Sequence, residues 1–219
     1  MICFVVALKK EAEGLLSKAT DLKEFFIKDK PSYSCKLNGR DVVICISGIG
    51  KVSAALTTQL LIDKYNPDFI FNFGTCGGMN DSVKILKYYL IDQCCQYDFD
   101  LSDLDDVPVG YIQEYNTVYF DTFTNDLDFL PKMKVASADR FTHKDSDVNL
   151  INKMGCSLCD MEAGAIAQVC KSNNIPCVVI KGISDIHGNG TAPEQFFQNL
   201  ATVGKGFPEI ILKVIDNLN

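Results

Sequence analysis

One apolar stretch near the carboxyl end of the chain, Val178-Val179-Ile180-Lys181-Gly182-Ile183, constrains the fold most strongly. Its β-branched residues predict a buried strand, and Ser184-Asp185 with the loop His187-Gly188-Asn189-Gly190 predicts where that strand ends. In open α/β sheets, ligands collect beyond the carboxyl ends of the strands. Asp185 is therefore placed for a reactive role, although Ser and Asp also commonly begin a turn.

Strand and helix patterns alternate along the rest of the chain, which predicts an α/β fold in a three-layer αβα arrangement. The expected strands cover residues 1–7, 24–28, 33–37, 41–46, 69–73, 84–93, 134–138 and 177–183, with a hairpin turn at Asn38-Gly39. The expected helices cover residues 9–18, 54–65, 161–172 and 193–218, with Gly204–Pro208 as a candidate break in the last. No repeat or linker interrupts the pattern, so residues 1–219 are expected to form one domain.

The composition limits the class of protein. The chain has 219 residues, of which 47% are hydrophobic and 22% charged, and this balance is typical of a globular domain. Its net charge of -7 argues against a nucleic-acid partner, which requires a basic face. No apolar run approaches the ~20 residues of a membrane helix. The first residues resemble a strand rather than a signal peptide, so a cytoplasmic protein is expected.

Ten cysteines are present, and several lie within apolar strand or helix patterns. Without an export signal, these cysteines are expected to be reduced and buried. The spacing Cys156-Ser157-Leu158-Cys159 could serve redox or zinc chemistry, but it lacks a second ligand pair. The sequence therefore predicts no metal and no cofactor.

Two glycine-rich segments and three carboxylates are the remaining candidates for a site. Ser47-Gly48-Ile49-Gly50 and Gly74-Thr75-Cys76-Gly77-Gly78 each follow a strand, where glycine lets the backbone approach a ligand or form a tight turn. Glu11 and Glu162 fall in first turns of expected helices, where the helix dipole alone favours a carboxylate by ~0.3–1 kcal/mol. Together with Asp185, these features could converge on one rim of the sheet.

In combination, these features resemble the nucleoside phosphorylase superfamily, and most closely its 5'-methylthioadenosine/S-adenosylhomocysteine nucleosidases. The resemblance extends over essentially the whole chain. It is carried by Glu11, Ser47-Gly48-Ile49-Gly50-Lys51-Val52, Gly74-Thr75-Cys76-Gly77-Gly78, Phe141-Thr142, Met161-Glu162-Ala163 and Ile183-Ser184-Asp185. The family has a mixed central sheet, and its members release adenine by hydrolysis of the N-glycosidic bond.

The resemblance implies a role for each matching position. Asp185 would protonate the leaving adenine, Glu11 would activate the attacking water, and Glu162 would bind the ribose hydroxyls. Further substrate contacts are implied for Ser184, Met161, Phe141, Thr142, Ile49, Thr75 and Gly77. The resemblance also implies a homodimer, in which Leu101, Leu104 and Pro108 would reach the pocket of the neighbouring subunit.

Two other functions are compatible with these motifs: a phosphate-dependent purine nucleoside phosphorylase and a nucleoside-binding protein without catalysis. The phosphorylases of the superfamily bind phosphate with arginines, and the two arginines here, Arg40 and Arg140, do not fall in phosphate-loop positions. The three carboxylates argue against a purely binding role. Lys181 departs from the family pattern, because arginine is more common there, and Thr75-Cys76 replaces the usual Ser-Ala.

Overall fold

The computed structural model describes residues 1–142, 144–188 and 192–218, so residues 189 and 190 of the expected glycine loop lie outside the described residues. Within the described residues, the strands form one ten-stranded sheet. They are β1 (Ile2–Val6), β2 (Thr20–Ile27), β3 (Lys30–Leu37), β4 (Arg40–Ile46), β5 (Phe69–Gly78), β6 (Tyr88–Gln96), β7 (Phe120–Asp121), β8 (Lys132–Ser137), β9 (Leu158–Asp160) and β10 (Cys177–Ile186). The helices are α1 (Lys9–Leu16), α2 (Lys51–Tyr65), α3 (Asp145–Lys153), α4 (Ala163–Asn173) and α5 (Ala192–Asn217), with a 3₁₀ turn at Gln113–Tyr115.

The sheet is mixed, as the family resemblance implies, and part of it closes on itself. β1 pairs in parallel with β4 and β5, while β2, β3 and β4 form an antiparallel meander at one edge. At the other end, β10 pairs in parallel with β5 and antiparallel with β6. The order β10-β6-β8-β9-β5 therefore returns to β10 and forms a closed barrel. The sheet thus differs from an open, flat layer.

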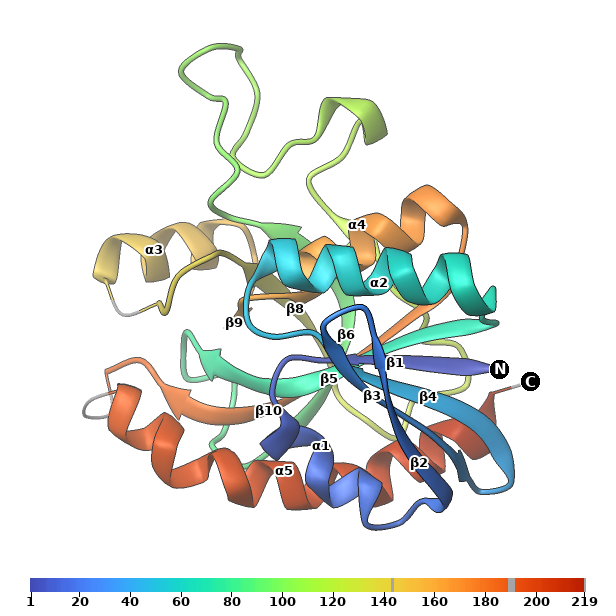
Figure 1. The fold of residues 1–219 in the computed structure, drawn as a ribbon. Coiled ribbons are helices and arrows are strands. Elements are labelled where there is room, and N and C mark those ends of the chain that lie inside the picture. Colours follow the sequence, from blue (N-terminus) through green and yellow to red (C-terminus); the bar gives the residue numbers. More distant parts are fainter. Residues whose placement is uncertain (143, 189–191, 219) are drawn as a thin grey trace.

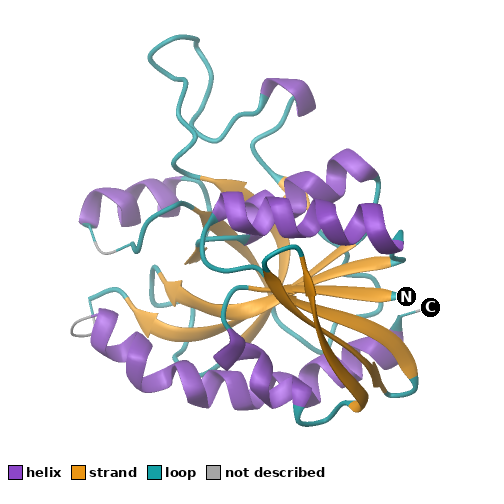
Figure 2. Ribbon diagram, viewed as in Figure 1, coloured by secondary structure: helices purple, strands orange, loops and turns teal. Residues whose placement is uncertain are grey.

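Helices cover both sides of the sheet (Figures 1 and 2). α2 and α4 lie on one side, and α1 and α5 lie on the other. The alternation of strand side chains divides the apolar core accordingly. Cys3 and Val5 of β1 belong to the core beneath α2 and α4, whereas Phe4 belongs to the core beneath α1 and α5. Because β1 and β10 each pair in parallel with β5, the carboxyl ends of these three strands lie at the same edge of the sheet.

Several expected boundaries need correction. β5 does not end at Phe73 but continues through the glycines to Gly78, and β10 continues past Ile183 to Ile186. The two strands pair with each other along these extensions, which supplies the backbone partners that a turn would lack. The expected break in the last helix is also wrong, because α5 runs unbroken through Pro208. The short β9 and α3 were not predicted from the sequence.

No helix in the described part of the chain is both long and apolar enough to cross a membrane. All ten cysteines lie within the described ranges, and each is a buried free thiol.

Candidate active site

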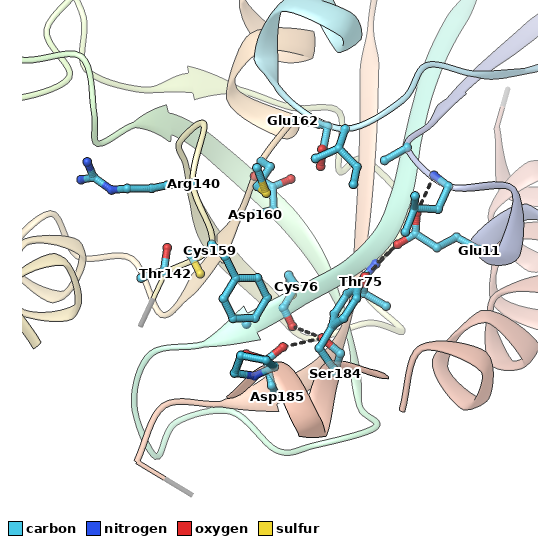
Figure 3. A pocket seen from close by; sticks show the side chains of 18 of the residues that line it. Glu11, Thr75, Cys76, Arg140, Thr142, Cys159, Asp160, Glu162, Ser184 and Asp185 are labelled. Carbon is cyan, nitrogen blue, oxygen red and sulfur yellow. Dashed lines mark hydrogen bonds between the residues drawn. The ribbon is translucent and has the colours of Figure 1, made fainter. Parts of the chain in front are cut away.

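A pocket opens where the carboxyl ends of β1, β5 and β10 meet (Figure 3). Most of the residues that the sequence suggested for a site line this pocket: Glu11, Ile49, Thr75, Gly77, Phe141, Thr142, Met161, Glu162, Ser184 and Asp185. Leu101, Leu104 and Pro108 do not line it. Ala7, Leu8, Cys76, Arg140, Cys159, Asp160, Pro193, Phe196 and Phe197 complete the lining without having been suggested. The pocket therefore gathers residues from both glycine segments and all three carboxylates.

Asp185 is directed into the pocket by an irregularity in β10. The register with β5 shifts between Ile183 and Asp185, so Ser184 is an extra residue that forms a β-bulge, a feature that can re-aim a side chain. The Ser184 hydroxyl donates a hydrogen bond of 2.6 Å to Asp185 Oδ1 and contacts the Cys76 carbonyl oxygen at 3.3 Å. Burial raises the Asp185 pKa to about 6, against the opposing effect of the Ser184 hydrogen bond. Asp185 can therefore hold a proton close to neutral pH.

Gly74 and Gly77 make room for the carboxylates and do not form a turn. Neither has a positive φ, and both lie within the continuous strand β5. A Cβ on Gly74 would lie 2.9 Å from Glu11 Oε1, and one on Gly77 would lie 3.1 Å from Asp185 Oδ2. These glycines are therefore explained by the space that the two carboxylates need and not by a tight turn.

Glu11 lies in the first turn of α1, as the sequence predicts, and its side chain is held by three donors. Glu11 Oε2 accepts the Leu8 N–H at 3.1 Å, and Oε1 accepts both the Thr75 N–H at 2.7 Å and the Thr75 hydroxyl at 2.8 Å. Burial raises the Glu11 pKa, while the Thr75 hydrogen bonds and the nearby Lys181 charge act in the opposite direction. The carboxylate is thus fixed in orientation and is 3% exposed.

Glu162 is not inside the first turn of its helix but is the N-cap residue of α4. Its Oε1 accepts the Gly50 N–H at 2.9 Å, which ties the helix to the first glycine segment. Gly50 has a φ of 98°, a conformation that favours glycine. Burial, reinforced by the charge of Asp160, raises the Glu162 pKa to about 7. The first glycine segment thus places a backbone donor on the second carboxylate.

A buried ion pair lies beside these carboxylates. Lys181 Nζ lies 2.7 Å from Asp160 Oδ2, and both side chains are at most 2% exposed. Asp160 also accepts the Ser137 hydroxyl at 2.5 Å and the Ala163 N–H at 2.9 Å. Burial opposes the charge on Lys181, but Asp160 and Glu162 outweigh it and raise the Lys181 pKa. The sequence marks Lys181 only as a departure from the family pattern and assigns no role to Asp160, although a lysine within an apolar strand signals a buried partner.

The mouth of the pocket is apolar and aromatic. Phe141 packs edge-on against Phe196 with 6.0 Å between ring centroids, and Phe196 packs against Phe197 at 5.3 Å. Ile49, Phe141 and Phe197 remain 54%, 39% and 76% exposed. One side of the pocket is therefore charged and buried, while the other presents apolar surface toward solvent. Among the described residues, no group of three or more His, Cys, Asp or Glu side chains is arranged to hold a metal ion.

The model of the phosphorylase superfamily matches residues 1–216. The chain therefore belongs to the phosphorylase superfamily, in agreement with its mixed α/β fold. A 5'-methylthioadenosine/S-adenosylhomocysteine nucleosidase of Buchnera aphidicola is 32% identical over 99% of this chain and 98% of its own length. Within the superfamily, the chain belongs to the family of these nucleosidases.

Solved structures agree with this assignment. A nucleosidase of the same family from Colwellia psychrerythraea, in complex with adenine, superimposes with a TM-score of 0.91 at 29% identity, covering 99% of this chain and 95% of its own. A protein from Borrelia burgdorferi, described as a putative member of the family and bound to adenine, superimposes with a TM-score of 0.90 at 26% identity, covering 100% of both chains.

The raised pKa of Glu162 has a consequence for stability. Because this pKa rises from 4.5 to about 7 on folding, the folded state binds more protons than the unfolded state between these values, and stability falls as pH rises. Glu162→Gln keeps an oxygen for the Gly50 N–H but carries no charge. We expect its gain in unfolding free energy over the wild type to grow by roughly 3 kcal/mol from about pH 4 to about pH 8.

Urea unfolding at the two pH values measures this difference. The matched control is Glu13→Gln, which changes an exposed glutamate on α1. If the unfolding free energy of Glu162→Gln differed from that of the wild type by the same amount at both pH values, this result would contradict a raised pKa for Glu162.

Proposed function

We propose that this protein hydrolyses the N-glycosidic bond of 5'-methylthioadenosine and S-adenosylhomocysteine, releasing adenine and the corresponding 5-thioribose product. The observation that carries the proposal is the pairing, in one pocket, of a carboxyl group that can hold a proton, Asp185, with a carboxylate fixed by three donors, Glu11. Hydrolysis of a nucleoside needs an acid that protonates the leaving purine and a carboxylate that accepts a proton from the attacking water.

Asp185 is proposed as the general acid. Adenine leaves poorly as an anion, so transfer of the Asp185 proton to adenine N7 as the bond from N9 to C1' breaks lowers the barrier. The Ser184 hydroxyl, which donates to Asp185 Oδ1, orients the carboxyl group. With a pKa of about 6, part of the Asp185 population remains protonated near neutral pH.

Glu11 is proposed to hold the attacking water and accept its proton as the oxygen bonds to C1'. This division of labour resembles an inverting glycosidase, in which acid and base lie on opposite faces of the sugar. As positive charge develops on the ribose ring, the neighbouring carboxylates stabilise it. Glu162 binds the ribose hydroxyls with Met161 beside the sugar, and Thr75 and Gly77 contact the substrate from β5. Phe141 stacks on adenine, and the backbone at Thr142 contacts the purine edge.

The surroundings of the two arginines favour hydrolysis over phosphorolysis. Arg40 donates to the Leu218 carbonyl oxygen at 2.7 Å and does not line the pocket. Arg140 does line the pocket, but its guanidinium pairs with Asp147 at 3.0 Å and lies over the Tyr97 ring. A phosphate nucleophile is usually held by bidentate arginine contacts. Water is therefore the nucleophile that this site supports best.

A comparison of substrates tests the proposal. Purified protein is incubated with 5'-methylthioadenosine, S-adenosylhomocysteine, adenosine and inosine, each with and without phosphate, and the base and sugar products are identified. We expect adenine and free 5-methylthioribose from methylthioadenosine at the same rate in both conditions. A sugar 1-phosphate product that forms only when phosphate is present would select the phosphorylase alternative. Tight binding of the nucleoside without release of the base would indicate a binding protein.

We also infer that residues 1–219 act as one domain with a helical layer on each side of the sheet, and that the protein is a cytoplasmic homodimer. The buried free cysteines support a reducing compartment. Exposed apolar side chains support association: Ile49 just before α2, Val52 and Leu56 on α2, and Leu104, which is 80% exposed. In the dimer, Leu101, Leu104 and Pro108 reach the partner's pocket. Sedimentation velocity would reveal a monomer if this inference is incorrect.

A further inference from the structure

Tyr97 lies directly after β6, outside the pocket lining, and is buried in an apolar cluster with 1% of its surface exposed. A buried tyrosine hydroxyl needs a hydrogen-bond partner, and here that partner is the Thr142 hydroxyl at 2.5 Å. The ring of Tyr97 has a second partner, because the Arg140 guanidinium lies over it at 5.0 Å from the centroid. One tyrosine therefore contacts the residues on both sides of Phe141.

The strand arrangement explains why these residues meet. β6 and β8 are parallel neighbours with Gln96 opposite Ser137, so the segments that follow them leave the same edge of the sheet side by side. Tyr97 and Asp98 follow β6, while residues 139–142 follow β8. The Asp139 N–H donates to Asp98 Oδ2 at 2.9 Å, which adds a third attachment next to those of Arg140 and Thr142.

Phe141 lies between Arg140 and Thr142 in the sequence, and it lines the pocket against Phe196. With its neighbours Arg140 and Thr142 both held by Tyr97, the backbone of the segment has little freedom to turn Phe141 out of the pocket. Figure 3 shows the Arg140 side chain extending away from the pocket residues. The Arg140 guanidinium instead contacts the Tyr97 ring and forms an ion pair with Asp147 at 3.0 Å.

We propose that Tyr97 is a positioning residue for base binding, which holds residues 140–142 through Thr142 and Arg140 so that Phe141 and the backbone beside it meet the purine. The inference rests on the proposed function, because it takes the ligand of Phe141 to be adenine. Tyr97 does not itself touch the substrate. Its effect is on affinity for the base, and the acid Asp185 remains unchanged.

The test uses Tyr97→Phe, Thr142→Val and the double variant, with the affinity for free adenine measured by calorimetry. Tyr97→Phe keeps the ring beneath Arg140 and removes the hydroxyl, which bonds to Thr142 and also interacts with the Arg140 side chain. We expect each single variant to bind adenine about fivefold more weakly than the wild type, which is the usual worth of one hydrogen bond. The double variant should lose clearly less than the sum of the two single losses, because both single variants remove the hydrogen bond between Tyr97 and Thr142.

The matched control is Tyr119→Phe. Tyr119 packs against the same apolar cluster, and its hydroxyl donates to the Met154 carbonyl oxygen at 2.6 Å. We expect the control to lower the melting temperature without changing adenine affinity. Kinetics add a second readout: Tyr97→Phe should raise KM for methylthioadenosine and leave the pH limbs of kcat in place.

The outcomes are distinguishable. A wild-type protein that does not bind adenine would refute the proposed function itself. A wild type that binds adenine, together with Tyr97→Phe that binds it equally well or loses only melting temperature like the control, would overturn the positioning role. Additive losses in the double variant would also overturn it, because they would show that the two hydroxyls act separately.

Discussion

Replacing Asp185 with Asn is expected to reduce kcat/KM for 5'-methylthioadenosine by about 10³-fold, within the range that general acid catalysis contributes. Asn fills the same space and can still accept the Ser184 hydroxyl hydrogen bond, which is 2.6 Å in the wild type. What it lacks is the proton for the departing adenine. Substrate binding, measured by calorimetry, should therefore change far less than the rate.

The pH dependence gives the same variant a sharper test. Asp185 acts in its protonated form, and with a pKa of about 6 this form is depleted as pH rises above that value. In the wild type, kcat/KM should fall on the basic side from about pH 6, and the residual activity of Asp185→Asn should lack that limb. Asp41→Asn, which changes an exposed aspartate paired with Lys36, is the control. Retained activity, or a basic limb that survives in the variant, would contradict the role of Asp185.

The sequence indicates these pocket-lining residues because the signals that mark them are local. A buried strand followed by Ser184-Asp185 can be identified from a few adjacent residues, and so can Glu11 after β1. Helix and strand patterns likewise locate most of the sheet. The Asn38-Gly39 hairpin turn is confirmed, with both residues at positive φ as a two-residue turn requires.

What the sequence could not indicate depends on partners distant along the chain. Gly74 and Gly77 resemble turn glycines locally, and only the carboxylates of Glu11 and Asp185 reveal why a side chain is excluded there. The strand β9 is three residues long and exists because β5 and β8 flank it. Gly204–Pro208 resembles a helix break locally, yet α5 continues through it, and Gly204 packs closely against Gly14 of α1. In each case tertiary contact outweighs local preference.

The buried pair Lys181–Asp160 is also a contact that local sequence does not reveal. Its disruption should have the largest effect on stability. Lys181→Met leaves the Asp160 carboxylate, which is 1% exposed, without its cation and near the carboxylate of Glu162. Breaking a buried ion pair by removing one partner typically costs about 3–5 kcal/mol. We expect a loss of this size in urea unfolding, whereas Lys36→Met, which removes one partner of an exposed pair, should change stability by less than about 1 kcal/mol.

The catalytic consequence of the same variant follows from charge. The positive charge of Lys181 lowers the pKa of Glu11 and of Glu162, so its removal raises both. Glu11 must be ionised to accept a proton from water, and the acidic limb of kcat/KM should therefore move to higher pH. Adding Asp160→Asn removes the uncompensated charge and should recover most of the lost stability, but it cannot restore the cation beside Glu11. A Lys181→Met protein as stable as the wild type, or an acidic limb that does not move, would show that the pair sets neither stability nor the ionisation of Glu11.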